Sequence, residues 1–304
     1  MFLFIHNFAA NRRQGPFSPK PGQDQEMKQT YTVAGLRAEL DKHSDKSIGF
    51  VPTMGALHEG HISLVERARE ENDMVVVSLF VNPTQFNDPE DLRKYPRTID
   101  SDLHLLEKAG ADIVFIPSVE EVYPEPDSRR FDFGNIDKVM EGATRPGHFN
   151  GVAQVVSRLF DIVKPGRVYF GEKDFQQIAI IKELVKQLDI DVKIIECPIV
   201  REGDGLAMSS RNALLTPEHR AAAPGIYSAL REAVMLKDML SVAEVEDHVR
   251  RTVEKNPLLQ VIYFNIVDAD TLIKISGWDE AKKIQGCIAV QAGAVRLIDN
   301  IRFI

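Results

Sequence analysis

One run of eight residues constrains the fold more than any other part of this sequence. Residues 74–81 read Met-Val-Val-Val-Ser-Leu-Phe-Val, an apolar run without the polar alternation of a half-exposed strand. Such a run is typical of a strand that is buried on both faces of a parallel sheet. Because parallel strands are joined by crossover connections that are usually helical, the run predicts an α/β protein.

The neighbouring segments follow the order of strands and helices that this architecture needs. Apolar spacing predicts helices over residues 33–43, 100–109, 152–163 and 178–188, and strands ending at residue 51 or spanning 113–116, 168–170 and 192–197. Pro52 is expected to end the first of these strands, because proline cannot donate to a sheet ladder. The order predicts a doubly wound, Rossmann-like parallel sheet with its ligand site outside the carboxyl ends of the strands.

The pattern changes after residue 211. Thr216 precedes Pro217 as a helix start, and Ser241 with Glu244 is a capping-box candidate for a second helix. Three strands are expected over residues 259–267, 284–291 and 295–301. We therefore expect three parts: a disordered extension rich in Pro, Gly, Gln and charge, the sheet domain, and a smaller α+β lid domain, over residues 1–26, 27–200 and 201–304.

Composition narrows the class of partner. The net charge of −8 over 304 residues argues against a nucleic-acid partner held by a broad basic surface, and no apolar run reaches the length of a membrane span. Cys197 and Cys287 have no metal or disulfide spacing and are expected to pack in the core. No basic residue precedes the short apolar run at 1–5, so a secretory signal is not expected and a reducing cytoplasm is the predicted location.

A glycine-bearing turn joins the first strand of the sheet domain to a helix. It carries His58 and His61, which lie three residues apart at the helix entrance, where a helix end attracts phosphate. Two familiar motifs are excluded: a zinc-protease helix would need histidine in place of Ile62, and a P-loop would need lysine in place of His61. Taken alone, this stretch has two equal interpretations: the two histidines bind phosphate, or they are ordinary surface residues.

Polar residues also follow the other strands of the predicted sheet. The segments that carry them are Asn82 and Gln85 with the aromatic Phe86; residues 171–174 with Gln176 and Gln177; and residues 201–212, which include Ser209, Ser210 and Arg211. Each is ordinary by itself, since Lys173 could be a solvated charge and Gln85 a surface amide. Because the carboxyl ends of parallel strands share one edge, the residues together predict a single site there.

Several longer motifs resemble one known family. Residues 58–61, His-Glu-Gly-His, match the His-x-Gly-His signature that the nucleotidyltransferase superfamily shares with class I aminoacyl-tRNA synthetases, and Met-Ser-Ser-Arg at 208–211 resembles its second ATP loop. The sequence is similar to the pantothenate synthetase (pantoate–β-alanine ligase) family at residues 80–86, 95–98, 171–177 and 204–212. This resemblance covers about residues 27–303, and residues 1–26 have no counterpart in it.

The resemblance implies an ATP-dependent condensation of (R)-pantoate with β-alanine through a pantoyl adenylate, releasing AMP and pyrophosphate. It implies His61 as proton donor, with His58 and Lys173 as further catalytic residues, and Gln85, Gln177 and Asn82 at the organic acids. The implied ATP-binding residues are Met54, Gly55, Ala56, Leu57, His58, Glu59, Gly60, His61, Gly171, Glu172, Lys173, Asp174, Val200, Met208, Ser209, Ser210 and Arg211.

The same resemblance implies Mg²⁺ as cofactor and a homodimer. Asp102 is a weak candidate for a magnesium ligand, and the metal ligands stay unassigned. Two alternatives remain from the sequence: a nucleotidyltransferase that makes a stable nucleotide-activated product, and a non-catalytic nucleotide- or tRNA-binding module. The two glutamines that follow separate strands favour a small polar acid as substrate, and hence the ligase.

Overall fold

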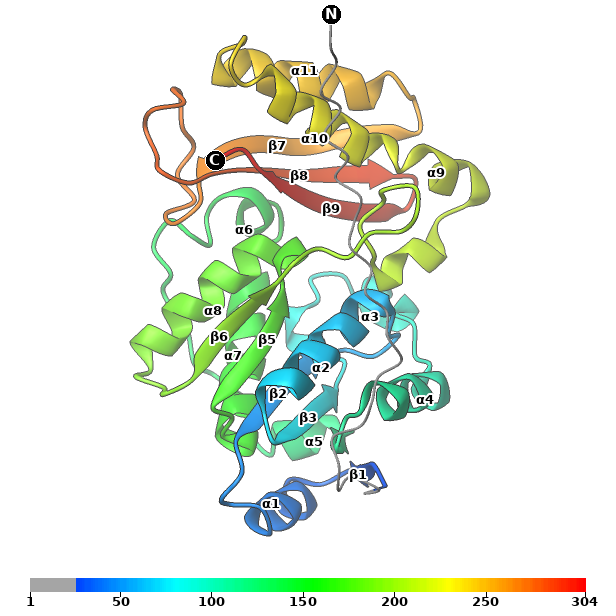
Figure 1. Cartoon of the computed structure of the whole chain (residues 1–304), viewed down its shortest axis with the longest axis vertical. Coiled ribbons are helices and arrows are strands. Elements are labelled where there is room, and N and C mark those ends of the chain that lie inside the picture. The colour runs from blue at the N-terminus through cyan, green and yellow to red at the C-terminus, as the bar shows by residue number, and fades with distance from the viewer. Residues whose placement is uncertain (1–25) are drawn as a thin grey trace, which may run out of the picture.

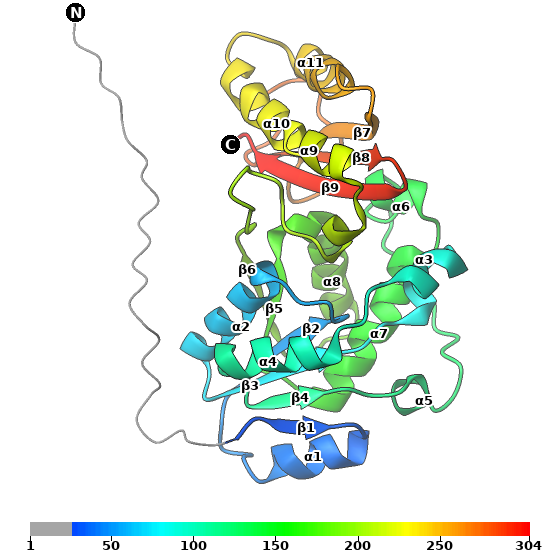
Figure 2. The same cartoon turned by 90° about the vertical axis from the view of Figure 1, so that its right-hand side faces the viewer.

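The computed structural model describes residues 26–304 of the chain, so all but the last residue of the expected disordered extension lies outside the described part. Figures 1 and 2 show a large sheet with helices on both faces, beneath a smaller sheet that is covered by two helices. The expected fold class, a doubly wound parallel sheet with a smaller C-terminal α+β part, is confirmed.

The large sheet has six strands, and every neighbouring pair in it is parallel. All six residues of β3 are buried, as its apolar run predicts. From β2 the chain builds outward through β3 to β4, and it then crosses back to β5 on the other side of β2. The strand order is β1-β4-β3-β2-β5-β6, with bounds Lys28–Thr30, Ile113–Phe115, Met74–Leu79, Ile48–Thr53, Arg167–Gly171 and Lys193–Cys197.

Helices cover both faces of this sheet with their apolar side chains. Buried side chains of α2 and α4 pack on one face with Val51, Val75 and Val77, whereas those of α1, α7 and α8 pack on the other with Phe50 and Val76. The helices of this part are α1 Val33–Asp41, α2 Glu59–Glu71, α3 Pro89–Lys94, α4 Ile99–Ala109, α5 Val119–Val122, α6 Met140–Thr144, α7 His148–Val163 and α8 Phe175–Gln187.

The expectation that Pro52 ends its strand is wrong, because β2 continues through Pro52 to Thr53 and pairs with β3 along its whole length. Thr53 accepts a hydrogen bond from the Phe80 backbone, so the main-chain groups of Thr53 point toward β3 and those of Pro52 point the other way. On that side, β5 pairs with β2 only at Gly49 and Phe50. The missing proline donor therefore falls where no ladder bond is required.

The smaller sheet is antiparallel, in the order β7-β8-β9. Its apolar residues pack with those of α10 and α11, and the predicted capping box of Ser241 and Glu244 is present at the start of α11. Helix α10, which follows Pro224, was not predicted. The elements are α9 Pro217–Ala222, α10 Gly225–Leu236, α11 Val242–Glu254, β7 Leu259–Asp268, β8 Ile284–Ala292 and β9 Val295–Arg302.

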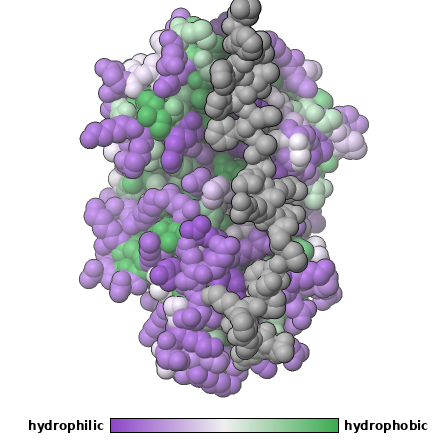
Figure 3. Space-filling model, viewed as in Figure 1, coloured by the Kyte–Doolittle hydropathy of each residue, from purple (hydrophilic) through white to green (hydrophobic). Residues whose placement is uncertain are grey.

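The character of the surface and the burial of the two cysteines agree with what the amino-acid composition predicts. Hydrophilic residues dominate the face in Figure 3, and its hydrophobic patches are separate. In the described part of the chain, no helix is long and apolar enough to cross a membrane. Cys197 and Cys287 are buried free thiols, which confirms their expected place in the core.

Gly151 in α7 generates a prediction about stability. A Cβ atom at this position would lie 2.4 Å from the Thr84 carbonyl oxygen and 2.8 Å from the Gln85 Cα atom. Both contacts are with backbone, so Gly151→Ala should lower the free energy of unfolding by about 1–3 kcal/mol, as overpacking does. Urea denaturation measures this change.

Gly225 provides the matched control, because it is also helical and a Cβ atom there meets nothing within 4 Å. Gly225→Ala should leave stability unchanged or raise it slightly, since alanine is the better helix former. Equal effects of the two substitutions would show that the close packing of α7 against Thr84 contributes nothing to the free energy of unfolding.

Candidate active site

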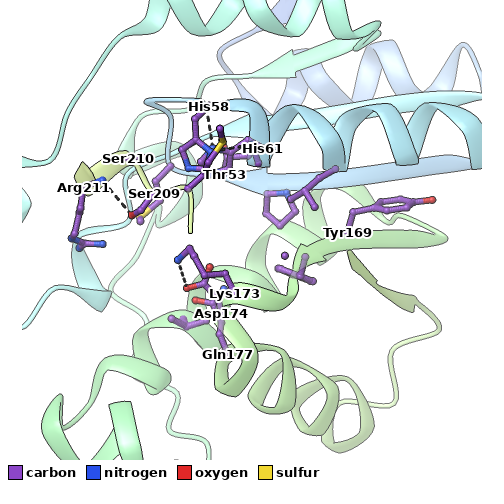
Figure 4. A pocket seen from close by; sticks show the side chains of 18 of the residues that line it. Thr53, His58, His61, Tyr169, Lys173, Asp174, Gln177, Ser209, Ser210 and Arg211 are labelled. Atoms are coloured by element: carbon purple, nitrogen blue, oxygen red, sulfur yellow. Dashed lines mark hydrogen bonds and ion pairs between the residues drawn. The ribbon is translucent and has the colours of Figure 1, made fainter. Parts of the chain in front are cut away.

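A cavity of about 220 Å³ opens at the carboxyl ends of β2 and β5, where the strand order reverses. Of the residues predicted for the site, it is lined by Met54, His58, Gly60, His61, Asn82, Gln85, Gly171, Lys173, Asp174, Gln177, Val200, Met208, Ser209, Ser210 and Arg211. Gly55, Ala56, Leu57, Glu59 and Glu172 are not among its lining residues. Figure 4 shows the histidines and the Ser209–Arg211 loop across the cavity from Lys173 and Gln177.

The turn between β2 and α2 is held by Asp102, a side chain of α4 that is only 1% exposed. Its carboxylate accepts hydrogen bonds from the backbone of Ala56 at 2.9 Å and of Leu57 at 2.8 Å, and from the Thr98 hydroxyl at 3.0 Å. Gly55 and Ala56 both have left-handed backbone angles, with φ of 82° and 51°. The carboxylate therefore stabilises a turn that the chain would not otherwise favour.

The two histidines cap α2 with their Nδ1 atoms. His58 Nδ1 accepts from the Gly60 backbone at 3.1 Å, and His61 Nδ1 accepts from the His58 backbone at 3.4 Å. A backbone N–H can only donate, so each Nδ1 carries a lone pair and each neutral ring carries its proton on Nε2. The ring centroids are 4.1 Å apart. The capped helix start thus presents two neighbouring Nε2–H donors.

The surroundings keep both rings neutral. Burial and then the positive charge of Lys173 lower the pKa of His58 to about 4. Burial, His58 and Lys173 lower the pKa of His61 well below its ordinary value. Protonation at Nδ1 would also remove the acceptor that each cap requires. At neutral pH the pair can donate hydrogen bonds but carries no charge.

The opposite wall starts at the short 3₁₀ turn η2, Glu172–Asp174, which follows β5. Asn300 of β9 donates to the carbonyl oxygens of Glu172 at 2.8 Å and Lys173 at 3.1 Å, which fixes the turn. The Lys173 ammonium group lies 3.3 Å from Asp174.

The two glutamines that follow η2 have different surroundings. Gln176 is bound to the backbone of Ile136, Val139 and Glu141, whereas the Gln177 amide has no hydrogen-bond partner among residues 26–304 and lines the cavity. Gln177 is therefore the one of the pair whose amide can meet a ligand.

The Ser209–Arg211 loop leads into the 3₁₀ turn η3, Ser210–Leu214, and is anchored at two points. The Ser210 hydroxyl donates to the Ala56 carbonyl oxygen at 2.8 Å, and the Arg211 guanidinium forms an ion pair with Asp91 at 3.0 Å. Both cationic side chains of the cavity, Lys173 and Arg211, thus come from segments that follow strands of the large sheet. An anionic ligand between them would face positive charge from two sides.

The third wall carries amides. Asn82 and Gln85 lie on either side of the start of η1, Pro83–Gln85, and their side chains are hydrogen-bonded at 3.1 Å. His148 contacts the Gln85 carbonyl oxygen with Nδ1 at 2.8 Å, and burial followed by the charge of Arg145 lowers its pKa to about 4. This residue was missed from the sequence, because it begins a helix far from any strand end.

Metal ligands were left unassigned from the sequence, and the described part of the chain contains no cluster of three or more His, Cys, Asp or Glu residues able to hold a metal ion. Both oxygens of Asp102, the weak magnesium candidate, already accept backbone hydrogen bonds.

Comparison with known proteins places this chain in one family. The family model described as pantoate-beta-alanine ligase matches residues 27–302. The pantothenate synthetase of Bacteroides thetaiotaomicron is 54% identical to this chain, and the match covers 91% of the chain and 99% of that relative. A pantothenate synthetase structure from Thermus thermophilus has a TM-score of 0.86 at 46% identity, covering 91% of this chain and 99% of that one.

A second structure was solved with ligands. It is the Francisella tularensis pantoate-beta-alanine ligase, complexed with "Beta-gamma ATP" and beta-alanine, and it has a TM-score of 0.77 at 38% identity. The match covers 91% of this chain and 98% of that one. Because the family model and these relatives span nearly all of the described residues, this chain belongs to the pantoate–β-alanine ligase family.

Proposed function

We propose that this chain condenses (R)-pantoate with β-alanine to give pantothenate, AMP and pyrophosphate. One observation carries this proposal. In this member of the family, a single cavity is lined by two neutral histidines, two cationic side chains and two amides that are either free or held in one orientation. In the first step a pantoate carboxylate oxygen bonds to the α-phosphorus of ATP, and the bond from that phosphorus to the β-phosphate oxygen breaks. In the second step the β-alanine amine attacks the carboxyl carbon, loses a proton and displaces AMP.

The first step brings anions together, so the site must offset negative charge. Lys173 and Arg211 supply positive charge, and the Nε2–H groups of His58 and His61 supply oriented donors. Donors of this kind act most strongly where charge develops in the transition state. We propose that His61 stabilises the α-phosphate during adenylyl transfer as a neutral hydrogen-bond donor, which refines the role of proton donor implied by the family resemblance.

We assign the remaining predicted residues by their place in the cavity. Met54, Gly60, Val200, Met208 and Ser209 would contact the nucleotide, Val200 through its backbone. Gly171, Asp174 and Ser210 line the same space. Gly55, Ala56, Leu57 and Glu59 would shape the turn that carries the histidines, and Glu172 would position Lys173. Magnesium would arrive with the substrate as Mg·ATP, since this ion is commonly held by substrate phosphates.

The organic acid would lie against the amides. Gln85 and Gln177 can each donate to a carboxylate or hydroxyl oxygen and accept from a hydroxyl. Once pantoyl adenylate has formed, these contacts would hold the acyl group while the amine of β-alanine attacks.

We propose the domain division near residue 200, with residues 201–304 as a lid. It is supported by the distinct apolar clusters of the two parts, which one small cluster of Met140, Val267, Leu272 and Cys287 joins. Limited proteolysis that cuts within either core first would contradict it. We also propose a cytoplasmic homodimer, from the family resemblance and the two buried free cysteines. A monomer in sedimentation at micromolar concentration, or enrichment outside the cytoplasmic fraction, would argue against these assignments.

The function is tested by measuring AMP release with each acid substrate omitted in turn. We expect sustained AMP and pyrophosphate release only when pantoate and β-alanine are both present. Pyrophosphate release without β-alanine-dependent AMP would instead indicate a nucleotidyltransferase with a stable product. No turnover under any condition would leave only a binding role.

His61 should matter to chemistry more than to ATP binding. His61→Ala should slow adenylate formation about 10²–10³-fold, because one oriented donor is lost in the transition state. His61→Asn should recover part of the rate, since its oxygen can replace the Nδ1 cap and its amide can donate. Rapid-quench measurement with pantoate and ATP gives the rate, and His104→Ala on the exposed side of α4 is the control. A normal adenylation rate in His61→Ala would exclude the proposed role.

The rate of adenylate formation should not depend on histidine titration between about pH 7 and 9, because both rings are already neutral there. If an imidazolium ion were required, the rate would fall about tenfold per pH unit above its pKa. Single-turnover rates across this range distinguish the two cases.

The same shifts affect stability. Unfolded histidines bind protons below about pH 6.5, whereas folded His58 does not until about pH 4. Their contribution to the free energy of unfolding should therefore be fully present above pH 6.5 and be lost as the pH falls toward 4. Unchanged stability over that interval would contradict the lowered pKa values.

The adjacent glutamines Gln176 and Gln177 should respond differently to substitution. Gln177→Ala should weaken pantoate use about tenfold or more while ATP affinity stays near normal, because a hydrogen bond to a charged group is lost. Gln176→Ala should instead lower the melting temperature, since its amide bonds three backbone groups. Equal losses of pantoate and ATP affinity in Gln177→Ala would overturn the assignment.

A further inference from the structure

We propose that Tyr123 is a positioning residue for the acid subsite and that it acts through Asn82 on the amide of Gln85. The inference rests on the proposed function, because it takes Gln85 to bind pantoate. Tyr123 follows α5, lies 41 residues beyond Asn82 in the sequence and does not line the cavity. Its hydroxyl nevertheless reaches Asn82 Oδ1 at 3.0 Å.

The orientation of the Asn82 amide follows from two backbone groups. Its Oδ1 atom accepts from the Thr84 backbone N–H at 3.4 Å and from the Thr84 hydroxyl at 3.1 Å, and its Nδ2 atom donates to the Gly151 carbonyl oxygen at 3.1 Å. A backbone N–H only donates and a carbonyl oxygen only accepts, so the two ends of the amide cannot be exchanged. Tyr123 must therefore donate to Oδ1.

The protonation state of Tyr123 suits this role. Burial raises the pKa of its phenol above the ordinary value, so the hydroxyl keeps its proton at neutral pH. Its ring packs near Phe80, with centroids 6.3 Å apart, and this packing would survive loss of the hydroxyl. The hydrogen bond and the packing of Tyr123 can thus be separated by experiment.

The orientation of Asn82 in turn sets that of Gln85. The remaining Nδ2 hydrogen of Asn82 donates to Gln85 Oε1 at 3.1 Å, which leaves Gln85 Nε2 turned the other way. Among residues 26–304 it meets there only the weak acceptor Met54 Sδ, at 3.2 Å, and both residues line the cavity. Gln85 therefore presents a donor to the substrate, which selects a carboxylate or hydroxyl oxygen.

Asn82 itself has no hydrogen left for the substrate. Both Nδ2 hydrogens are used, and Oδ1 accepts from three donors. Asn82 was predicted to contact the acids, and this geometry assigns it instead to orienting Gln85. Tyr123 tightens the chain of hydrogen bonds that runs from its hydroxyl through Asn82 to the Gln85 amide.

The test compares four forms of the full-length enzyme: wild type, Tyr123→Phe, Gln85→Ala and the double variant. Tyr123→Phe should raise KM for pantoate about fivefold, as loss of one neutral hydrogen bond does, with kcat and KM for ATP unchanged. In the Gln85→Ala background the same change should add nothing, because the chain then has no end group to orient. Tyr31→Phe, which removes an exposed hydroxyl bonded to the Gln29 amide, should have no effect.

The remaining outcomes distinguish failure of this inference from failure of the proposed function. An unchanged KM for pantoate in Tyr123→Phe, or a full fivefold effect in the Gln85→Ala background, would overturn the inference. A joint fall in kcat, ATP affinity and melting temperature in Tyr123→Phe would also overturn the inference, because such a fall would indicate that the substitution destabilises the fold as a whole. If the wild-type enzyme releases no pantoate-dependent AMP, the proposed function fails instead.

Discussion

The buried carboxylate of Asp102 is the interaction on which the rest of the site depends. A charge that is 1% exposed is costly unless it is hydrogen-bonded, and here it accepts from Ala56, Leu57 and Thr98. The left-handed angle of Ala56 costs about 1–2 kcal/mol, which these bonds offset. Helix α4 thereby fixes the turn that follows β2, and this turn fixes the position of the histidines at the start of α2.

This arrangement changes how the site can recognise phosphate. A helix N-terminus usually offers free backbone donors, but here the backbones of Ala56 and Leu57 bond Asp102, and those of His58 and Gly60 bond the histidine rings. The main-chain donors of the turn are therefore largely spent on its own geometry. They fix the direction of two Nε2–H groups. In the proposed function, phosphate recognition would therefore rest on side chains, which substitution can test one by one.

The sequence predicted those features that leave a local pattern. The fully buried strand β3 was predictable from its apolar composition. The polar residues after the strands could be assigned to one rim because parallel strands end at one edge. The partners of these residues left no such signal. Asp102, His148, Asn300 and Tyr123 reach the site through tertiary hydrogen bonds from helices, a distant strand and a loop, and each is an ordinary polar residue in its own stretch. The three-residue strand β1 and the path of β2 through Pro52 depend likewise on a neighbouring strand.

The smaller sheet supports the walls of the cavity through hydrogen bonds from β9, although its own residues do not line the cavity. On β9, Asp299 forms a two-pronged ion pair with Arg201 at 2.6 and 2.9 Å, and this arginine starts the segment that leads to Ser209. The next residue, Asn300, holds the carbonyl oxygens of the turn that carries Lys173. Two consecutive residues of one strand therefore tie together the segments that supply both cations of the cavity. A lid that moved with β9 would have to break the Asn300 bonds or carry the Lys173 turn with it. In the proposed function, closure over ATP would then be coupled to the position of the Lys173 charge.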